Sequence, residues 1–96
     1  MLNTMKHINW SPEKNKQLIE DRNISFEDVV FYLKQGALLD DIKHPNEKKY
    51  PNQRVFVINI GGYAHLVPYV ENRDEIFLKT IIPSRKATKQ YIGEMI

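Results

Sequence analysis

Apolar and polar residues alternate with a period of two through the middle of the chain, which predicts β-strands. Two such runs, residues 54–60 (RVFVINI) and 63–70 (YAHLVPYV), flank Gly61 and Gly62. A Gly-Gly pair between two strands is typical of a two-residue hairpin turn, because both turn positions need a positive φ. Apolar side chains occur on both faces of this hairpin, so we expect each face to be at least partly covered.

The two-residue turn also determines which residues lie opposite each other across the hairpin. It pairs Arg54 with Tyr69 and Ile58 with His65. One face then carries Arg54, Phe56, Ile58, His65, Val67 and Tyr69, and the other carries Val55, Val57 and Leu66. Pro68 has no N–H to donate to a neighbouring strand, so we expect a bulge or a sheet edge at that point.

Two helices are predicted before the hairpin. Ser11-Pro12-Glu13 combines an N-cap residue, a proline at the first helical position and an acid in the first turn, which predicts a helix over 12–22. This helix has few apolar residues, so we expect an outer helix with residues 14–16 facing solvent. The second helix begins at Ser25, which has capping-box spacing to Asp28. Apolar residues at helical spacing then predict one buried face, and Gly36 ends the helix.

Three further strands and a short final helix complete the expected fold. The strands cover residues 6–10, with Ile8 toward the core, residues 37–42, and residues 76–82, where Pro83 ends the run. The register of the last strand stays open. The order of elements predicts a single domain over residues 1–96, of class α+β. It has an antiparallel sheet of about four to five strands, two N-terminal helices and a short C-terminal helix.

Composition narrows the possible classes of protein. Without cysteine, the chain can form neither disulfides nor a thiolate zinc site. A hydrophobic content of 42%, with five Tyr, four Phe and one Trp, favours a folded globule over disorder. Residues 1–7 lack the apolar core of a signal peptide, and no apolar run is long enough to span a membrane. We therefore expect a soluble, cytoplasmic protein with no membrane partner.

Charge is distributed unevenly along the chain. Residues 20–41 hold six acids against two cations, residues 43–54 hold four cations against one acid, and residues 79–91 hold four cations and no acid. The early part of the chain is therefore acidic and the later part basic, and a basic surface suits a phosphate-rich partner. The middle segment includes a long loop that carries His44 and Tyr50.

The last basic segment begins where Pro83 interrupts a strand. Ser84 can cap a short helix whose first residues are Arg85 and Lys86. Cations at a helix N-terminus oppose the helix dipole, so this arrangement favours a nearby anion such as a phosphate or an acidic side chain. The alternative is a solvated basic surface that binds nothing.

Several chemistries lack the residues that they require. No glycine-rich phosphate loop is present, and His7, His44 and His65 lack the spacing of metal ligands. Ser11 and Ser84, like Ser25, are better explained as helix caps than as nucleophiles. We therefore expect neither a metal nor a cofactor.

The remaining polar groups are cations, imidazoles and phenols: Arg54, His65, Tyr69, Lys79, Arg85, Lys86 and Lys89, with His44 and Tyr50 on the loop. Metal-independent RNA cleavage uses such groups. A base takes the 2′-hydroxyl proton, an acid protonates the leaving 5′-oxygen, and a cation stabilises the phosphorane. Arginine suits the last role because its planar fork binds two phosphate oxygens. The structural alternatives are a half-buried His65 beside Ile58 and a cation–π pair of Arg54 with Tyr69.

Two motifs near the ends of the chain resemble those of BrnT-type toxins. Residues 9–15 (NWSPEKN) and 24–28 (ISFED) are similar to that family's F-x-W-D-x-x-K-N … G-(V/I)-S-F-E-E-A opening. Residues 81–88 (IIPSRKAT) and the later Tyr91 are similar to its R-I-I-S-A-R-K-A-T … Y ending. Arg54 falls where the family has an arginine that opens the central hairpin.

The resemblance implies a RelE-like fold and a ribonuclease toxin of a type II toxin–antitoxin pair, which inhibits translation by cutting RNA. It also implies a small antitoxin of ribbon-helix-helix type, with operator DNA bound only through the toxin–antitoxin complex. The residues assigned to catalysis are Arg54, His65, Lys79 and Arg85, and those assigned to substrate binding are Tyr69, Lys86, Lys89 and Tyr91. Thr80, next to Lys79, replaces the arginine that the family has before its paired isoleucines.

Two other functions stay open. The first is a non-catalytic interaction module of the same fold, which binds a protein partner or a nucleic acid without cutting it. The second is a small DNA-binding regulator, which is disfavoured because the sequence shows no helix-turn-helix with a basic recognition helix.

Overall fold

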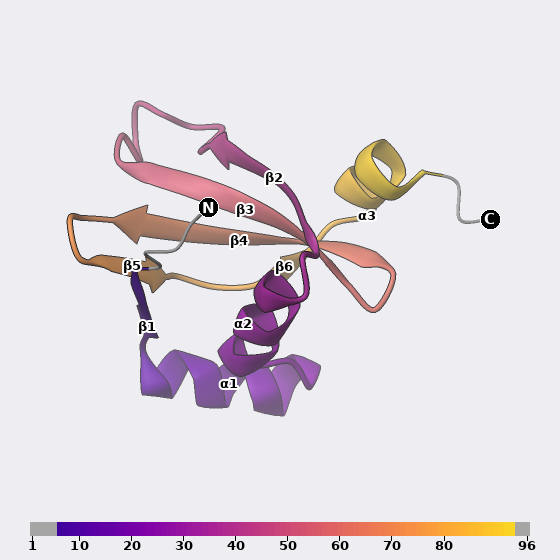
Figure 1. The fold of residues 1–96 in the computed structure, drawn as a ribbon, viewed down its shortest axis with the longest axis horizontal. Helices are drawn as coiled ribbons and strands as arrows, with labels where there is room; N and C mark the ends of the chain where they lie inside the picture. The colour runs from indigo at the N-terminus through magenta and orange to yellow at the C-terminus, as the bar shows by residue number, and fades with distance from the viewer. Residues whose placement is uncertain (1–5, 94–96) are drawn as a thin grey trace.

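The computed structural model describes residues 6–93, and the expected hairpin forms the centre of its sheet (Figure 1). In chain order the elements are β1 (His7–Trp10), α1 (Pro12–Arg22), α2 (Phe26–Lys34), β2 (Leu38–Lys43), β3 (Gln53–Ile60), β4 (Tyr63–Glu71), β5 (Glu75–Leu78), β6 (Ile82–Pro83), α3 (Arg85–Ala87) and the π-helical turn η1 (Thr88–Ile92). The strands lie in the order β1-β5-β4-β3-β2, and β6 pairs with β4. The protein is therefore a small α+β domain.

The register of the β3–β4 hairpin is the one expected from the sequence. Arg54 lies opposite Tyr69, and the pairing continues without interruption to the turn. Gly61 and Gly62 have φ values of +64° and +90°. A residue with a Cβ rarely adopts such values, so the two glycines allow the tight turn that holds this register.

The sheet is mixed, which corrects the expectation of an antiparallel sheet. It has six strands, and β1 runs parallel to β5, with Ile8 beside Ile76 and Trp10 beside Leu78. The paired strands come from opposite ends of the chain. Local apolar patterns identify a strand but do not specify a distant neighbour or its direction, so the sequence did not reveal this pairing.

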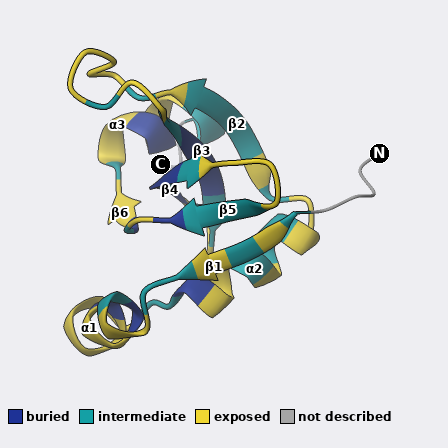
Figure 2. Ribbon diagram, turned by 90° about the vertical axis from the view of Figure 1, so that its left-hand side faces the viewer, coloured by how far each residue is buried: buried dark blue, intermediate teal, exposed yellow. Residues whose placement is uncertain are grey.

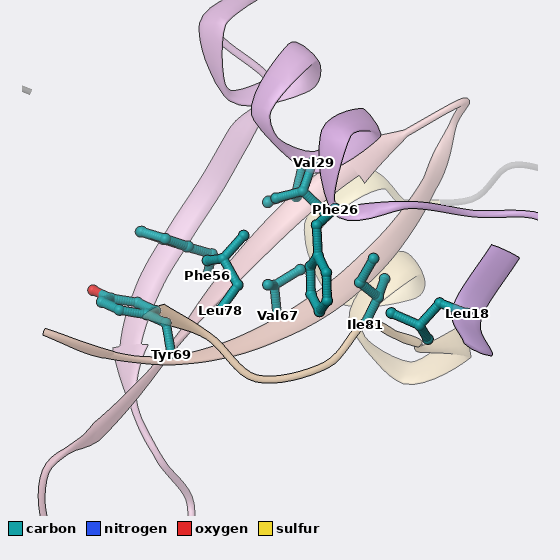
Figure 3. Close-up of a cluster of buried hydrophobic side chains, with 9 residues drawn as sticks. Leu18, Phe26, Val29, Phe56, Val67, Tyr69, Leu78 and Ile81 are labelled. Atoms are coloured by element: carbon teal, nitrogen blue, oxygen red, sulfur yellow. The ribbon is translucent and has the colours of Figure 1, made fainter. Parts of the chain in front are cut away.

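Each face of the sheet is covered by a different hydrophobic cluster. We call the first the α1/α2 face, because the two N-terminal helices lie against it (Figure 3). Its buried residues include Leu18, Phe26, Val29, Phe56, Ile58, Val67, Leu78 and Ile81. The second, the α3 face, has Val57 and Ala64 packed against Ala87. Alternation of side chains along β3 and β4 creates this division, as expected.

Both N-terminal helices begin where the sequence predicted. Ser11 Oγ accepts a hydrogen bond from the Lys14 N–H, and Ser25 and Asp28 form the expected capping box. Figure 2 shows that α1 is largely exposed, as expected for an outer helix.

Asn15 is buried, which corrects the expectation that residues 14–16 face solvent. Its side-chain oxygen accepts a hydrogen bond of 2.7 Å from the Phe26 N–H, and its side-chain nitrogen donates one of 2.8 Å to Glu27. The first N–H groups of a helix have no partner within that helix. Asn15 therefore caps the start of α2 from the neighbouring helix.

The last strand is interrupted, which corrects the expected continuous run over residues 76–82. β5 ends at Leu78, and its register with β4 is shifted by one residue when β6 begins. Opposite this bulge, Pro68 O accepts a hydrogen bond of 2.8 Å from the Lys79 N–H. The N–H and C=O of a strand residue point to the same side, so the missing N–H of Pro68 weakens this ladder and not the one with β3.

None of the helices within residues 6–93 has the length and apolar character needed to cross a membrane. The expectation that no signal sequence is present rests mainly on residues 1–5. These lie outside the described residues, as do residues 94–96.

Candidate nucleic-acid interface

The helix α3 is held against the start of β4 by backbone and hydroxyl groups. The Ser84 N–H donates to Ala64 O (3.0 Å), and Ser84 Oγ accepts from the Ala87 N–H (3.0 Å), as expected for an N-cap. The Thr88 hydroxyl accepts from the Ala64 N–H (2.8 Å) and donates to Ser84 O (2.7 Å). These bonds fix the basic segment on the α3 face.

The cations of this segment project into solvent. Arg85, Lys86 and Lys89 are exposed, and the ion pairs found within residues 6–93 join other side chains. α3 has only three residues before the π-helical turn begins. Because so few peptides are aligned, the dipole of α3 is weak, and the expected repulsion between this dipole and the cations is small. The attraction for an anion comes instead from the three side-chain charges.

Lys79 lies on the same face as α3, which settles a position that the sequence left open. Its ammonium is 5.6 Å from the centre of the Phe77 ring. Phe77 precedes the buried Leu78 in β5, and Leu78 belongs to the core of the α1/α2 face. Alternation therefore places Phe77, and Lys79 above it, on the α3 face.

Arg54 and Tyr69 lie on the α1/α2 face and share a carboxylate. The Tyr69 hydroxyl donates to Asp41 Oδ1 (2.7 Å), and Arg54 donates to that oxygen through Nε (3.1 Å) and to Asp41 O through Nη2 (2.9 Å). Burial and the Asp41 carboxylate raise the pKa of Tyr69, and hydrogen bonds to Tyr69 and Asp41 raise the pKa of Arg54. The ring of Tyr69 stacks on Phe56 at 4.0 Å. Asp41 thus joins Arg54 and Tyr69, for which the sequence offered a direct cation–π pair as the structural alternative.

His65 is half-buried on the α1/α2 face. Its Nδ1 is 2.8 Å from Tyr63 O, and because a carbonyl only accepts, Nδ1 carries the proton and Nε2 is the free acceptor. Burial lowers the pKa of His65, which favours the neutral ring at pH 7. His65 and Tyr69 are four residues apart on β4, so their Cα atoms are roughly 13 Å apart. His65 and the Arg54–Tyr69 pair therefore form separate sites.

Tyr91 connects η1 to the sheet on the α3 face. Its hydroxyl donates to Asp40 Oδ2 at 2.7 Å. This bond lowers the pKa of Asp40, and the carboxylate raises the pKa of Tyr91. The Tyr91 hydroxyl is therefore engaged within the protein, and its contribution here is to position η1.

The loop between β2 and β3 presents two rings in contact, tilted by 38° to each other, beside a cation. The rings of His44 and Tyr50 are 4.5 Å apart, and the Lys49 ammonium is 5.5 Å from the centre of the Tyr50 ring. The Asn46 N–H donates to His44 Nδ1 at 3.0 Å. Nδ1 is thus the acceptor, and His44 presents Nε2–H as a donor.

The structure therefore divides the expected site residues between two faces. Lys79, Arg85, Lys86, Lys89 and Tyr91 belong to the α3 face, whereas Arg54, His65 and Tyr69 belong to the α1/α2 face. The eight residues do not converge on one phosphate, because the residues of the hairpin that face α1 and α2 cannot also face α3.

Asp40 and Asp41 had no assigned role from the sequence. They are adjacent, so they point to opposite faces of β2, where one binds Tyr91 and the other binds Arg54 and Tyr69. A signal was available, because two acids inside the apolar run of β2 need partners when that strand is partly buried.

Comparisons with known proteins add no family assignment. The sequence matches no protein-family model, and no similar curated protein or solved structure was found. Within residues 6–93, no three His, Cys, Asp or Glu side chains gather in a way that could hold a metal ion. The fold and the site thus define a small α+β domain with a basic face.

Proposed function

We propose that this protein is a ribonuclease toxin of BrnT type with a RelE-like fold, and that it binds RNA on the α3 face. One observation carries the proposal. Arg85, Lys86 and Lys89 are exposed, outside the ion pairs found within residues 6–93, and anchored to β4 through Ser84 and Thr88. A fixed group of free cations suits a polyanion whose charges follow one another along a chain.

The chemistry proposed is the metal-independent attack of a 2′-hydroxyl on the adjacent phosphorus. The attack forms the bond to phosphorus and breaks the bond to the 5′-oxygen, which leaves a 2′,3′-cyclic phosphate and a free 5′-hydroxyl. Arg85 binds the oxygens on which charge develops, and Lys86 and Lys89 hold the flanking phosphates. The proton that leaves the 2′-hydroxyl is removed by a base, and a proton is returned to the 5′-oxygen.

A small antitoxin, of ribbon-helix-helix type, is the proposed protein partner, and operator DNA is bound only through the complex. The sequence motifs at residues 9–15 and 81–88 support this part of the proposal. Coexpression with the neighbouring reading frame, followed by copurification, tests it.

The principal test is RNA cleavage by Arg85→Ala, with EDTA present to exclude metal-dependent nucleases. Loss of one charge-stabilising donor reduces cleavage by about 100-fold or more. Arg73→Ala, which removes an exposed arginine between β4 and β5, serves as the matched control and cuts normally. A single 2′-deoxy substitution at the cut site blocks the reaction. An intact RNA after incubation with wild-type protein contradicts the proposal.

A second candidate, a non-catalytic nucleic-acid-binding module, is favoured by one specific observation. His65, whose Nε2 can accept a proton, lies on the α1/α2 face and not beside Arg85. RNA binding without cleavage, reduced by Arg85→Ala, is the result that selects this alternative.

A further inference from the structure

An apolar hollow of about 200 Å³ opens on the α3 face beside the basic segment. It is lined by Ile42, His44, Pro45, Val55, Leu66, Pro68 and Ile82. His44 is the one polar side chain in this lining. The volume equals that of roughly six or seven liquid water molecules, so the hollow accommodates one flat ring rather than a whole nucleotide.

The hollow exists because α3 and η1 cover only part of this face. They pack on Val57 and Ala64, whereas the hollow lies farther along β4, at Leu66 and Pro68. Leu66 pairs with Ile82, which is 41% exposed at the rim. Only two residues separate Ile82 from Arg85, so the hollow and the first cation of α3 are neighbours.

The surroundings of the hollow are positively charged. Across from the basic segment, the loop after β2 supplies the exposed Lys48 and Lys49 against one acid, Glu47. No carboxylate lines the hollow. Cations on both sides of an apolar hollow complement a ligand with a flat apolar face and phosphates on both sides of it.

His44 gives the hollow a fixed aromatic wall. Its ring is supported by Tyr50 at 4.5 Å and held in orientation by the hydrogen bond from the Asn46 N–H to Nδ1. Stacking on an aromatic ring is the usual way in which proteins hold an unpaired base. The Nε2–H group of His44 also offers a donor to a base edge.

We infer that this hollow is a subsite for one unpaired nucleobase of single-stranded RNA. The base enters against His44, and the phosphates on its two sides contact the loop lysines and the cations of α3. The inference rests on the proposed function in taking RNA as the ligand. It deepens that function by giving the protein a preference for unpaired over duplex RNA.

The test compares two short oligonucleotides with the same number of phosphates, one of 2′-O-methyl RNA and one with abasic residues. Neither is cleaved, because no free 2′-hydroxyl is present. Fluorescence anisotropy shows the base-bearing strand bound about 10-fold more tightly than the abasic strand. Equal affinities overturn the subsite.

Variants locate the effect. Ile82→Glu and His44→Ala lower the ratio of the two affinities toward one. Ile19→Glu and His7→Ala, at exposed positions of α1 and β1, keep it. The ratio cancels the general effect of added charge on phosphate binding. An unchanged ratio in Ile82→Glu overturns the location of the subsite.

A second measurement does not depend on substitution. A 2-aminopurine base in the oligonucleotide loses fluorescence when it stacks on His44, and an unchanged signal on saturation contradicts the subsite. A retained affinity ratio without RNA cleavage refutes the ribonuclease proposal and leaves the subsite intact. RNA cleavage with an affinity ratio of one supports the ribonuclease proposal and refutes the subsite. If neither strand binds, the ribonuclease proposal and the subsite are both refuted.

Discussion

Asn15 shows how one polar side chain determines the arrangement of two helices. Its amide uses both ends, accepting from the Phe26 N–H and donating to Glu27. The hydrogen bond from Asn15 is the main reason that the pKa of Glu27 is lowered. At the residue scale, the stability of the α1–α2 corner therefore depends on a side chain that the apolar pattern assigned to solvent.

Asn15→Ala is expected to lower the free energy of unfolding by about 1–3 kcal/mol, because the Phe26 N–H loses its buried acceptor. Urea denaturation measures the change. Gln17→Ala, at an exposed position of the same helix, is the control for the loss of an amide and changes stability little. Equal denaturation midpoints for the two variants would show that the Asn15 bonds do not stabilise the corner.

Stability should fall on mild acidification because of His65. Its pKa is lowered in the folded protein by burial, whereas the unfolded chain has an ordinary value of about 6.5. As the pH falls below that value, the unfolded chain binds the proton first, so stability declines until the folded pKa is passed. Thermal melts at pH 7.5 and pH 5 measure the decline (roughly these values span the titration). His65→Gln reduces this decline in stability, and His7→Gln, at an exposed position, does not. An equal decline in the wild-type protein and in both variants contradicts the assignment of the effect to His65.

At the scale of elements, Pro68 and Thr88 together determine where the basic segment lies. Pro68 interrupts the ladder between β4 and the last strand, and the bulge that follows brings Ile82 and then Ser84 beside β4. Thr88 then joins the start of β4 to the segment through a hydroxyl that both accepts and donates. The position of α3 thus results from hydrogen bonds of backbone and hydroxyl groups and not from its charges.

Thr88→Val keeps the shape of the side chain and removes the hydroxyl. The Ala64 N–H then lacks an acceptor, which costs about 1–3 kcal/mol of stability and loosens α3. RNA affinity is expected to fall although no charge has changed, as measured by anisotropy. Thr80→Val, at a half-buried position, is the control. Unaltered affinity in Thr88→Val would mean that α3 need not be anchored for binding.

At the scale of the whole molecule, the two faces carry different electrostatic arrangements. On the α1/α2 face, Arg54 is neutralised by Asp41, whereas the cations of α3 and η1 stand free of the ion pairs found within residues 6–93. A net charge of +2 conceals this difference. A polyanion is therefore attracted to one face of a protein that is nearly neutral overall.

The salt dependence of RNA binding should report the number of phosphates on the α3 face. For single strands, each contacted phosphate contributes about 0.7 to the slope of log affinity against log salt concentration. Lys86→Ala and Lys89→Ala are each expected to reduce the slope by about 0.7. Lys34→Ala, on α2, leaves it unchanged. If all three variants show the same salt dependence of RNA binding, the RNA binds outside the α3 face.

Local chemistry in the sequence was sufficient to predict α1, α2, the hairpin and the cap of α3. Each of these depends on residues close together in the chain, such as the capping box at Ser25 or the glycine turn at Gly61. The candidate site was predicted only as a set of residue types. The motif resemblance that suggested an RNA-cutting toxin stays a prediction.

The tertiary structure decided which of those residues belong together. The parallel pairing of β1 with β5, the burial of Asn15 and the engagement of Arg54 and Tyr69 by Asp41 all join residues far apart in the chain or on different elements. Short-range propensities do not encode such partners, because they arise from the packing of whole elements. The sequence by itself determined the basic segment and its cap, and only the packing of α3 against β4 brought its cations beside an apolar hollow.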